Sequence, residues 1–282
     1  MNRKVAGWLV ALAVLAGCSS EPRKPELNLT NLINGKQRTE SFRMRDRYRH
    51  PRETLEFFGI RPEMTVVEIW PAPGWYAEIL APLLHDSGQY IAAGFVTNWE
   101  GAPQWRIDAM NEFGSKLAAR PDLYDRVNVT EVGKPDRWAP APAGSADLVL
   151  TFRNVHNWMA GEYEAEMFTA FYNALKPGGT LGVVEHRANP GTDLETMKKT
   201  GYVTEEYVMQ LAANAGFQFV ARAEVNANPK DTKDYPEGVW TLPPSLKLGD
   251  QDRAKYLDIG ESDRMTLMFV KPAAVAPAPA QQ

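Results

Sequence analysis

Residues 64–75 read MTVVEIWPAPGW, and this stretch decides the fold. Apart from Glu68, its first seven residues are apolar or β-branched, and prolines bound the run on both sides, which predicts a buried strand. The prolines and Gly74 that follow predict a tight loop. Apolar residues then recur at helical spacing up to Leu84. A strand, a tight loop and a helix in this order form half of a βαβ unit.

The same alternation continues on both sides of this stretch. We expect further strands over 89–95, 127–132, 146–152, 180–185, 217–225 and 265–271. We expect helices from Pro51 to Gly59 and over 105–119, 162–175 and 204–215. This rhythm predicts an α/β fold with a doubly wound, largely parallel sheet of the Rossmann-like kind. The fold would carry an N-terminal helical extension and a long insertion, residues 226–264, before the last strand.

Composition narrows the class of protein. The chain has 282 residues, 44% of them hydrophobic and 23% charged, as in ordinary globular proteins. Its formal net charge of −4 makes the whole molecule a poor electrostatic match for nucleic acid, so we expect no nucleic-acid partner. With one cysteine, the chain forms no internal disulfide.

The first eighteen residues resemble a bacterial lipoprotein signal. Arg3 and Lys4 precede a short apolar stretch, and the segment ends in Leu-Ala-Gly before Cys18, which is the only cysteine. The resemblance implies that Cys18 is acylated and that lipid anchors the chain to the bacterial cell envelope, facing the periplasm. Ser19 next to the cysteine implies delivery to the outer membrane.

This signal gives the predicted domain organisation. We expect a signal peptide over 1–17, a polar tether over 18–29, one folded domain over 30–272 and a disordered Ala/Pro-rich tail over 273–282.

Three segments carry a family resemblance: VVEIWPAPGWYAEILAPLL (66–84), ADLVLTFRNVHNW (146–158) and LKPGGTLGVVEH (175–186). They resemble class I S-adenosylmethionine-dependent methyltransferases. More narrowly, the chain is similar to a group of predicted bacterial methyltransferases with six further motifs. These are RHPxETLxFFG (49–59), EIWP (68–71), TFRNVHNW (151–158), GVVEHR (182–187), NANPKDTKDYP (226–236) and GVWTLPP (238–244).

The resemblance implies S-adenosyl-L-methionine as cofactor. It places Glu68 at the family's acidic position, and Trp70, Ala72 and Gly74 at its three glycines. Prolines between them remove two amide donors, so shape and aromatic rings would hold the cofactor. The family's ribose-binding carboxylate after the second strand is missing here. The expected cofactor-binding residues are Glu68, Trp70, Ala72, Gly74, Trp75, Tyr76, Asn98 and Asn154.

Two histidines are the expected catalytic residues. His156 follows the fourth strand and His186 ends the fifth, at the edge of the sheet where ligands bind in this fold. An imidazole titrates near working pH and is suited to act as a general base on a methyl acceptor. Because the four histidines are scattered and no thiol is left free, we expect no metal.

Two functions remain open. The first is a methyltransferase acting on a small-molecule or envelope-associated substrate. The alternative is a non-catalytic ligand-binding lipoprotein on the same fold, favoured by the missing ribose carboxylate and the proline-filled loop. The basic stretch 36–52 either lies over the cofactor site, faces anionic lipid headgroups near the anchor, or forms a solvated helix face paired with acidic neighbours. In the insertion 226–264, Asp231 and Trp240 are candidate wall residues of the site. Whether Trp70 or Trp75 fills the cofactor space discriminates the two functions.

Overall fold

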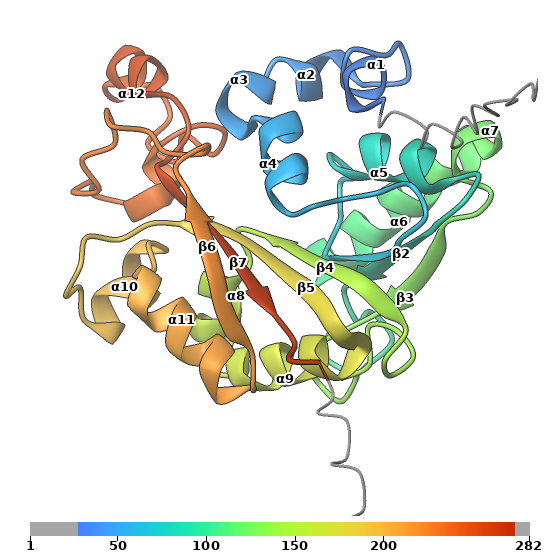
Figure 1. Ribbon diagram of the computed structural model, residues 1–282. Coiled ribbons are helices and arrows are strands. Elements are labelled where there is room, and N and C mark those ends of the chain that lie inside the picture. The colour runs from blue at the N-terminus through green and yellow to red at the C-terminus, as the bar shows by residue number, and fades with distance from the viewer. Residues whose placement is uncertain (1–27, 274–282) are drawn as a thin grey trace, which may run out of the picture.

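The computed structural model describes residues 28–273, and its centre is a seven-stranded sheet (Figure 1). The order across the sheet is β3-β2-β1-β4-β5-β7-β6. The strands are β1 (Thr65–Ile69), β2 (Gln89–Gly94), β3 (Asn128–Glu131), β4 (Ala146–Phe152), β5 (Leu175–His186), β6 (Gln218–Ala223) and β7 (Arg264–Val270). The predicted leader, Cys18 and nearly all of the tail lie outside the described residues.

The direction of the last strand matters for the site. The four pairings from β3 to β5 are parallel, whereas β7 runs antiparallel between β5 and β6. The first residue of β7, Arg264, therefore pairs with His186, the last residue of β5. The start of β7 thus joins the carboxyl edge of the parallel strands, where ligands bind in doubly wound folds.

Helices cover both faces of the sheet (Figure 1). The N-terminal ones lie on one face, and α8 to α11 lie on the other. The helices up to β4 are α1 (Leu29–Ile33), α2 (Glu40–Arg43), α3 (Asp46–Arg49), α4 (Pro51–Phe57), α5 (Ala77–Leu84), α6 (Gln104–Ala119) and α7 (Pro121–Tyr124). The later ones are α8 (Val155–Gly161), α9 (Glu164–Ala174), α10 (Leu194–Thr200), α11 (Glu205–Asn214), the 3₁₀ turn η1 (Gly238–Thr241) and α12 (Arg253–Ile259).

The strand sequences explain these two layers. Successive side chains of a strand point to opposite faces, and both faces are buried here, so the central strands are nearly continuous apolar runs. In β1, Val66 joins the core beneath α1, α4 and α5, whereas Val67 and Ile69 join the core beneath α8 and α9. The fold class expected from the sequence is therefore confirmed.

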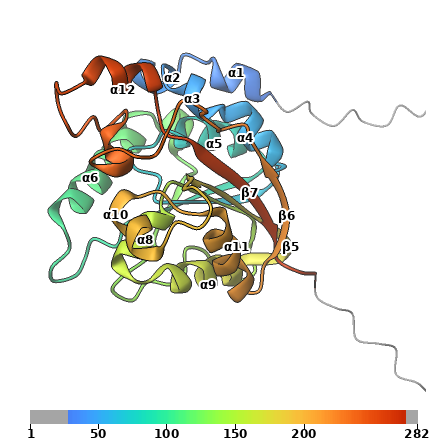
Figure 2. The same ribbon diagram turned by 90° about the vertical axis from the view of Figure 1, so that its left-hand side faces the viewer.

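The structure corrects several predicted bounds. Strand β5 begins at Leu175, five residues before its predicted start, because Lys176 to Gly179 form an irregular extension of the strand. The helix α8 directly after β4 was not predicted, since only seven residues form it. The insertion before β7 holds η1 and α12 and lies beside α2 and α3 in both views (Figures 1 and 2). Within residues 28–273, no helix has the length and apolar character that crossing a membrane requires.

Candidate functional site

A cavity of about 280 Å³ opens where β1, β4 and β5 end. The connection between α2 and α3 covers one side, and the insertion before β7 covers another through Trp240 in η1 and Pro243 just after it. The other walls are the β1–α5 loop, the strand ends and the first residue of β7. The cavity therefore lies at the strand edge that the topology predicts for ligands.

The structure brings most of the predicted site residues together. Those that line the cavity are Glu68, Trp70, Ala72, Trp75, Tyr76, His156 and His186. Gly74 instead turns the chain into α5 with a φ of 94°, packed against Phe113. Asn98 is exposed. Asn154 donates to the carbonyl of Ile69 at 3.1 Å and so holds β4 to β1. These last three do not contribute to the cavity wall.

Trp70 covers the ends of the second and third strands. It adopts a φ of 54°, unusual for a large side chain, and its indole reaches across the sheet to donate to the carbonyl of Val132 at 2.9 Å. Its ring lies 4.6 Å from that of Phe95, and the Arg106 guanidinium lies 5.2 Å from its centre. Only 7% of Trp70 is exposed. The space above β2 and β3 is therefore filled by protein.

Trp75 and Tyr76 form a second aromatic group on the opposite wall. The Trp75 indole donates to the carbonyl of Phe42 at 3.0 Å and lies between two guanidinium groups, those of Arg38 and Arg49, each 4.8 Å from its centre. Tyr76 stacks on Phe152 with ring centres 3.7 Å apart. These contacts fix the N-terminal segment against the β1–α5 loop.

Glu68 lies at the base of the cavity and is almost fully buried. Burial raises the pKa of its carboxyl to about 8, although the Tyr90 hydroxyl, which donates to it at 2.6 Å, and the nearby arginines act in the opposite direction. Glu68 is therefore mostly protonated at pH 7 and supplies little negative charge to the site.

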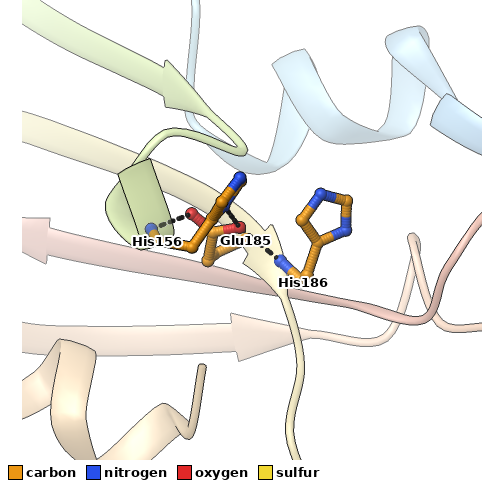
Figure 3. A group of neighbouring side chains, drawn as sticks. All are labelled: His156, Glu185 and His186. Atoms are coloured by element: carbon orange, nitrogen blue, oxygen red, sulfur yellow. Dashed lines mark hydrogen bonds and ion pairs between the residues drawn. The ribbon is translucent and has the colours of Figure 1, made fainter. Parts of the chain in front are cut away.

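His156, Glu185 and His186 meet at the ends of β4 and β5 (Figure 3). The Glu185 carboxylate lies 3.0 Å from His156 Nδ1 and accepts the backbone N–H groups of His156 and His186 at 3.3 and 2.7 Å. A carboxylate at Nδ1 fixes the ring orientation and its tautomer. His156 is thus equipped to take up or release a proton in the cavity.

His186 is held differently. Its Nδ1 lies 2.5 Å from the Ser262 hydroxyl, and its ring centre lies 5.2 Å from that of His156. Burial, together with His156 and three arginines, lowers the pKa of His186 well below its usual value. His186 is therefore neutral at pH 7 and offers a hydrogen bond rather than a charge.

The same three side chains have the residue types of a metal site. One possible ligand atom from each lies within 4.8 Å of the others, all of them buried. However, the Glu185 oxygens already accept three N–H groups. Arg49, Arg153 and Arg264 also lie close enough to lower the pKa of His186. These positive charges oppose a divalent cation at this place.

Two of the arginines that line the cavity lie outside the basic stretch and were not predicted from the sequence. Arg45 and Arg49 belong to that stretch, but Arg153 follows β4 and Arg264 begins β7, and all four line the cavity. Arg153 stands inside the quoted TFRNVHNW motif, but it was not predicted as a site residue. The position of Arg264 at the cavity could not be predicted from the sequence, because it depends on the antiparallel direction of β7. Trp240 lines the cavity as expected. Asp231 does not line it and instead accepts a hydrogen bond from the Tyr202 hydroxyl.

Comparison with known proteins identifies the fold. No family model and no curated protein matches the chain. Among solved structures, a SAM-dependent methyltransferase from Aquifex aeolicus aligns with a TM-score of 0.54 at 15% identity, covering 87% of this chain and 100% of its own. The cyclase SpnF aligns with a TM-score of 0.52 at 17% identity, covering 88% and 92%. The chain therefore has the fold of S-adenosylmethionine-dependent methyltransferases, a fold that SpnF shares.

The residues present do not fit S-adenosylmethionine in the family's usual place. The resemblance puts the ribose beside the end of β2, where the Trp70 ring packs against Phe95 and its indole continues to the Val132 carbonyl. The remaining cavity, about 280 Å³, is at the lower end of small-molecule pockets, roughly 300 to 1,000 Å³, and is small for a ligand with both an adenosyl group and a methionine chain. Its arginines also oppose a sulfonium cation. No chemical step through this cofactor follows from the site.

Proposed function

We propose that this protein binds a small molecule in the cavity at the ends of β1, β4 and β5, as a ligand-binding lipoprotein on a methyltransferase fold. The observation that carries the proposal is the position of Trp70, whose indole lies over the ends of β2 and β3 and leaves a cavity beside it. That cavity has aromatic walls and a few buried polar groups, as ligand pockets do.

A second candidate is an S-adenosylmethionine-dependent methyltransferase acting on a small-molecule or envelope-associated substrate. Two observations favour it. The chain aligns with the Aquifex aeolicus methyltransferase over 87% of its length, and Glu68 lines the cavity from the family's acidic position. In that case His156, held by Glu185, would be the general base.

Calorimetric titration with S-adenosylmethionine and its demethylated product separates the two. We expect no heat with the wild-type protein at millimolar ligand. The Trp70→Gly variant restores the family's glycine and removes the indole, so weak binding is expected to appear in it. Wild-type binding tighter than about 100 μM, roughly 5 to 6 kcal/mol, would instead establish the cofactor site and favour the methyltransferase.

We also propose that the protein acts in the bacterial cell envelope, anchored by lipid at Cys18 and facing the periplasm. The support is the leader sequence, with Arg3 and Lys4 before an apolar stretch that ends at the single cysteine. The full chain should incorporate labelled palmitate and fractionate with outer membranes. The Cys18→Ser variant should do neither, and unchanged labelling of that variant would contradict the anchor.

A further inference from the structure

Four arginines converge on the cavity from separate parts of the chain. Arg45 precedes α3 and Arg49 ends it, Arg153 follows β4, and Arg264 begins β7. Arg49 and Arg264 are only 5% and 2% exposed. Burying several guanidinium groups together is costly unless counter-charges lie nearby. The carboxylates around them therefore decide what the cavity can accept.

The available carboxylates do not neutralise this cluster. Glu261 forms ion pairs with Arg45, Arg49 and Arg264. Although burial acts to raise it, these arginines hold the pKa of Glu261 well below its usual value. Arg153 forms no ion pair with any residue in the 28–273 range, and burial lowers its pKa to about 10, so it stays charged at pH 7.

The balance of charge is positive. Glu261 is one carboxylate paired with three of the four arginines, and Glu68 is mostly neutral, so positive charge is in excess around the cavity. A buried surplus of positive charge favours the entry of negative charge.

Hydrogen-bond donors are also unused. The Nε atoms of Arg49 and Arg264 are buried without a hydrogen-bond partner. Both residues line the cavity, and the Arg49 guanidinium is held over the Trp75 ring. Guanidinium groups match the planar oxygen pairs of carboxylates and the oxygens of phosphates.

From charge and donors together, we infer that the ligand is a small organic anion with at least two acidic groups, held by Arg49, Arg153 and Arg264. This inference rests on the proposed function, because it names the class of molecule for the same cavity. The cavity volume of about 280 Å³ is close to the lower limit of small-molecule pockets, roughly 300 Å³. The ligand is therefore expected to be compact, of the size of citrate.

The experiment measures citrate and inorganic phosphate binding to the purified protein by calorimetry and thermal unfolding, with sodium chloride at matched ionic strength as reference. Citrate is expected to bind with a Kd below about 1 mM and to raise the melting temperature. Phosphate is expected to bind more weakly, because it engages fewer of the arginines.

Arg153→Met supplies the decisive variant. It removes the unpaired charge while keeping a long apolar side chain. We expect citrate affinity to fall by about tenfold or more, and the ligand-free variant to melt no lower than the wild type, since repulsion within the cluster is relieved. The exposed Arg253 in α12 lies outside the cavity, so Arg253→Met is the control and should bind citrate as the wild type does.

Each other outcome is decisive. Citrate binding that equals the chloride effect, or that Arg153→Met leaves unchanged, would overturn the anion inference. If neither citrate nor S-adenosylmethionine binds, the inference of an anionic ligand is wrong. The proposed binding of a small molecule in the cavity then requires a neutral ligand. If S-adenosylmethionine binds to the wild type and citrate does not, both proposals fall. Binding of Zn²⁺ or Mn²⁺ without citrate would assign His156, Glu185 and His186 to a metal instead.

Discussion

At the scale of single residues, the buried Glu68 carboxyl links stability to pH. Its pKa is about 8 in the folded protein, against about 4.5 when exposed. Below pH 4.5 it is protonated in both states, so its contribution is fully present. As pH rises towards 8, only the unfolded chain releases the proton, and the folded state loses this stability.

Glu68→Gln should remove this dependence while still accepting the Tyr90 hydroxyl. We expect the variant to gain a few kcal/mol of unfolding free energy over the wild type at pH 8, with a much smaller gain near pH 4.5. Urea unfolding at both pH values measures this difference. Glu112→Gln changes an exposed carboxyl on α6 and should show no such pattern. Equal effects of Glu68→Gln at both pH values would contradict the buried, protonated state.

Glu185 stabilises the fold in addition to orienting His156. It is fully buried and accepts three N–H groups from the two histidines. Glu185→Leu would leave these donors without a partner, so we expect a loss of about 3 kcal/mol or more in unfolding free energy. Glu185→Gln retains one acceptor oxygen and should lose less. A Leu variant as stable as the wild type would show that water replaces the carboxylate.

At the scale of elements, the N-terminal helices depend on one carboxylate of α5. Glu78, 1% exposed, accepts the backbone N–H and the hydroxyl of Thr39 at 2.8 and 2.5 Å. It also pairs with Lys116 and Arg38. These contacts hold the segment that contains α2 and α3, and hence Arg45 and Arg49, over the cavity.

Glu78→Ala should therefore loosen this segment more than the rest of the fold. We expect amide hydrogen exchange over residues 39–49 to become faster, while the buried amides of α9 keep their protection. Citrate affinity should fall in the same variant. Glu166→Ala, an exposed site on α9, is the control. Uniformly faster exchange would show that Glu78 supports global stability rather than this segment.

The elements also show what sequence can and cannot predict. All seven strands were predicted to within a few residues, except for the start of β5, because central strands are long apolar runs. The histidines at the ends of β4 and β5 followed from topology alone. The direction of the Trp70 indole could not be predicted from topology, since it depends on a positive φ and on the Val132 carbonyl across the sheet. Glu261 could not be assigned either, because its arginine partners come from distant segments.

At the scale of the whole molecule, the site is the place where three distant parts of the chain meet. The N-terminal helices and the segment around the start of β7 share Glu261 and its arginines, next to the ends of β4 and β5, and the insertion lies beside α3 (Figure 2). The N-terminal segment supplies Arg45 and Arg49, whereas Arg153 and Arg264 lie at the ends of sheet strands. The proposed ligand specificity thus depends on additions to the fold together with strand ends of its sheet.

The positive cavity lies in a chain whose formal net charge is −4. A dissolved anion is therefore repelled at a distance and attracted only near the cavity mouth. Salt screens the distant repulsion first, because charges farther apart than about 8 Å interact weakly at physiological ionic strength. The association rate of citrate should consequently change little or rise as salt increases moderately, while its dissociation becomes faster. Stopped-flow fluorescence of the cavity tryptophans would resolve the two rates, and a steep fall of the association rate would show that the cavity field dominates at long range.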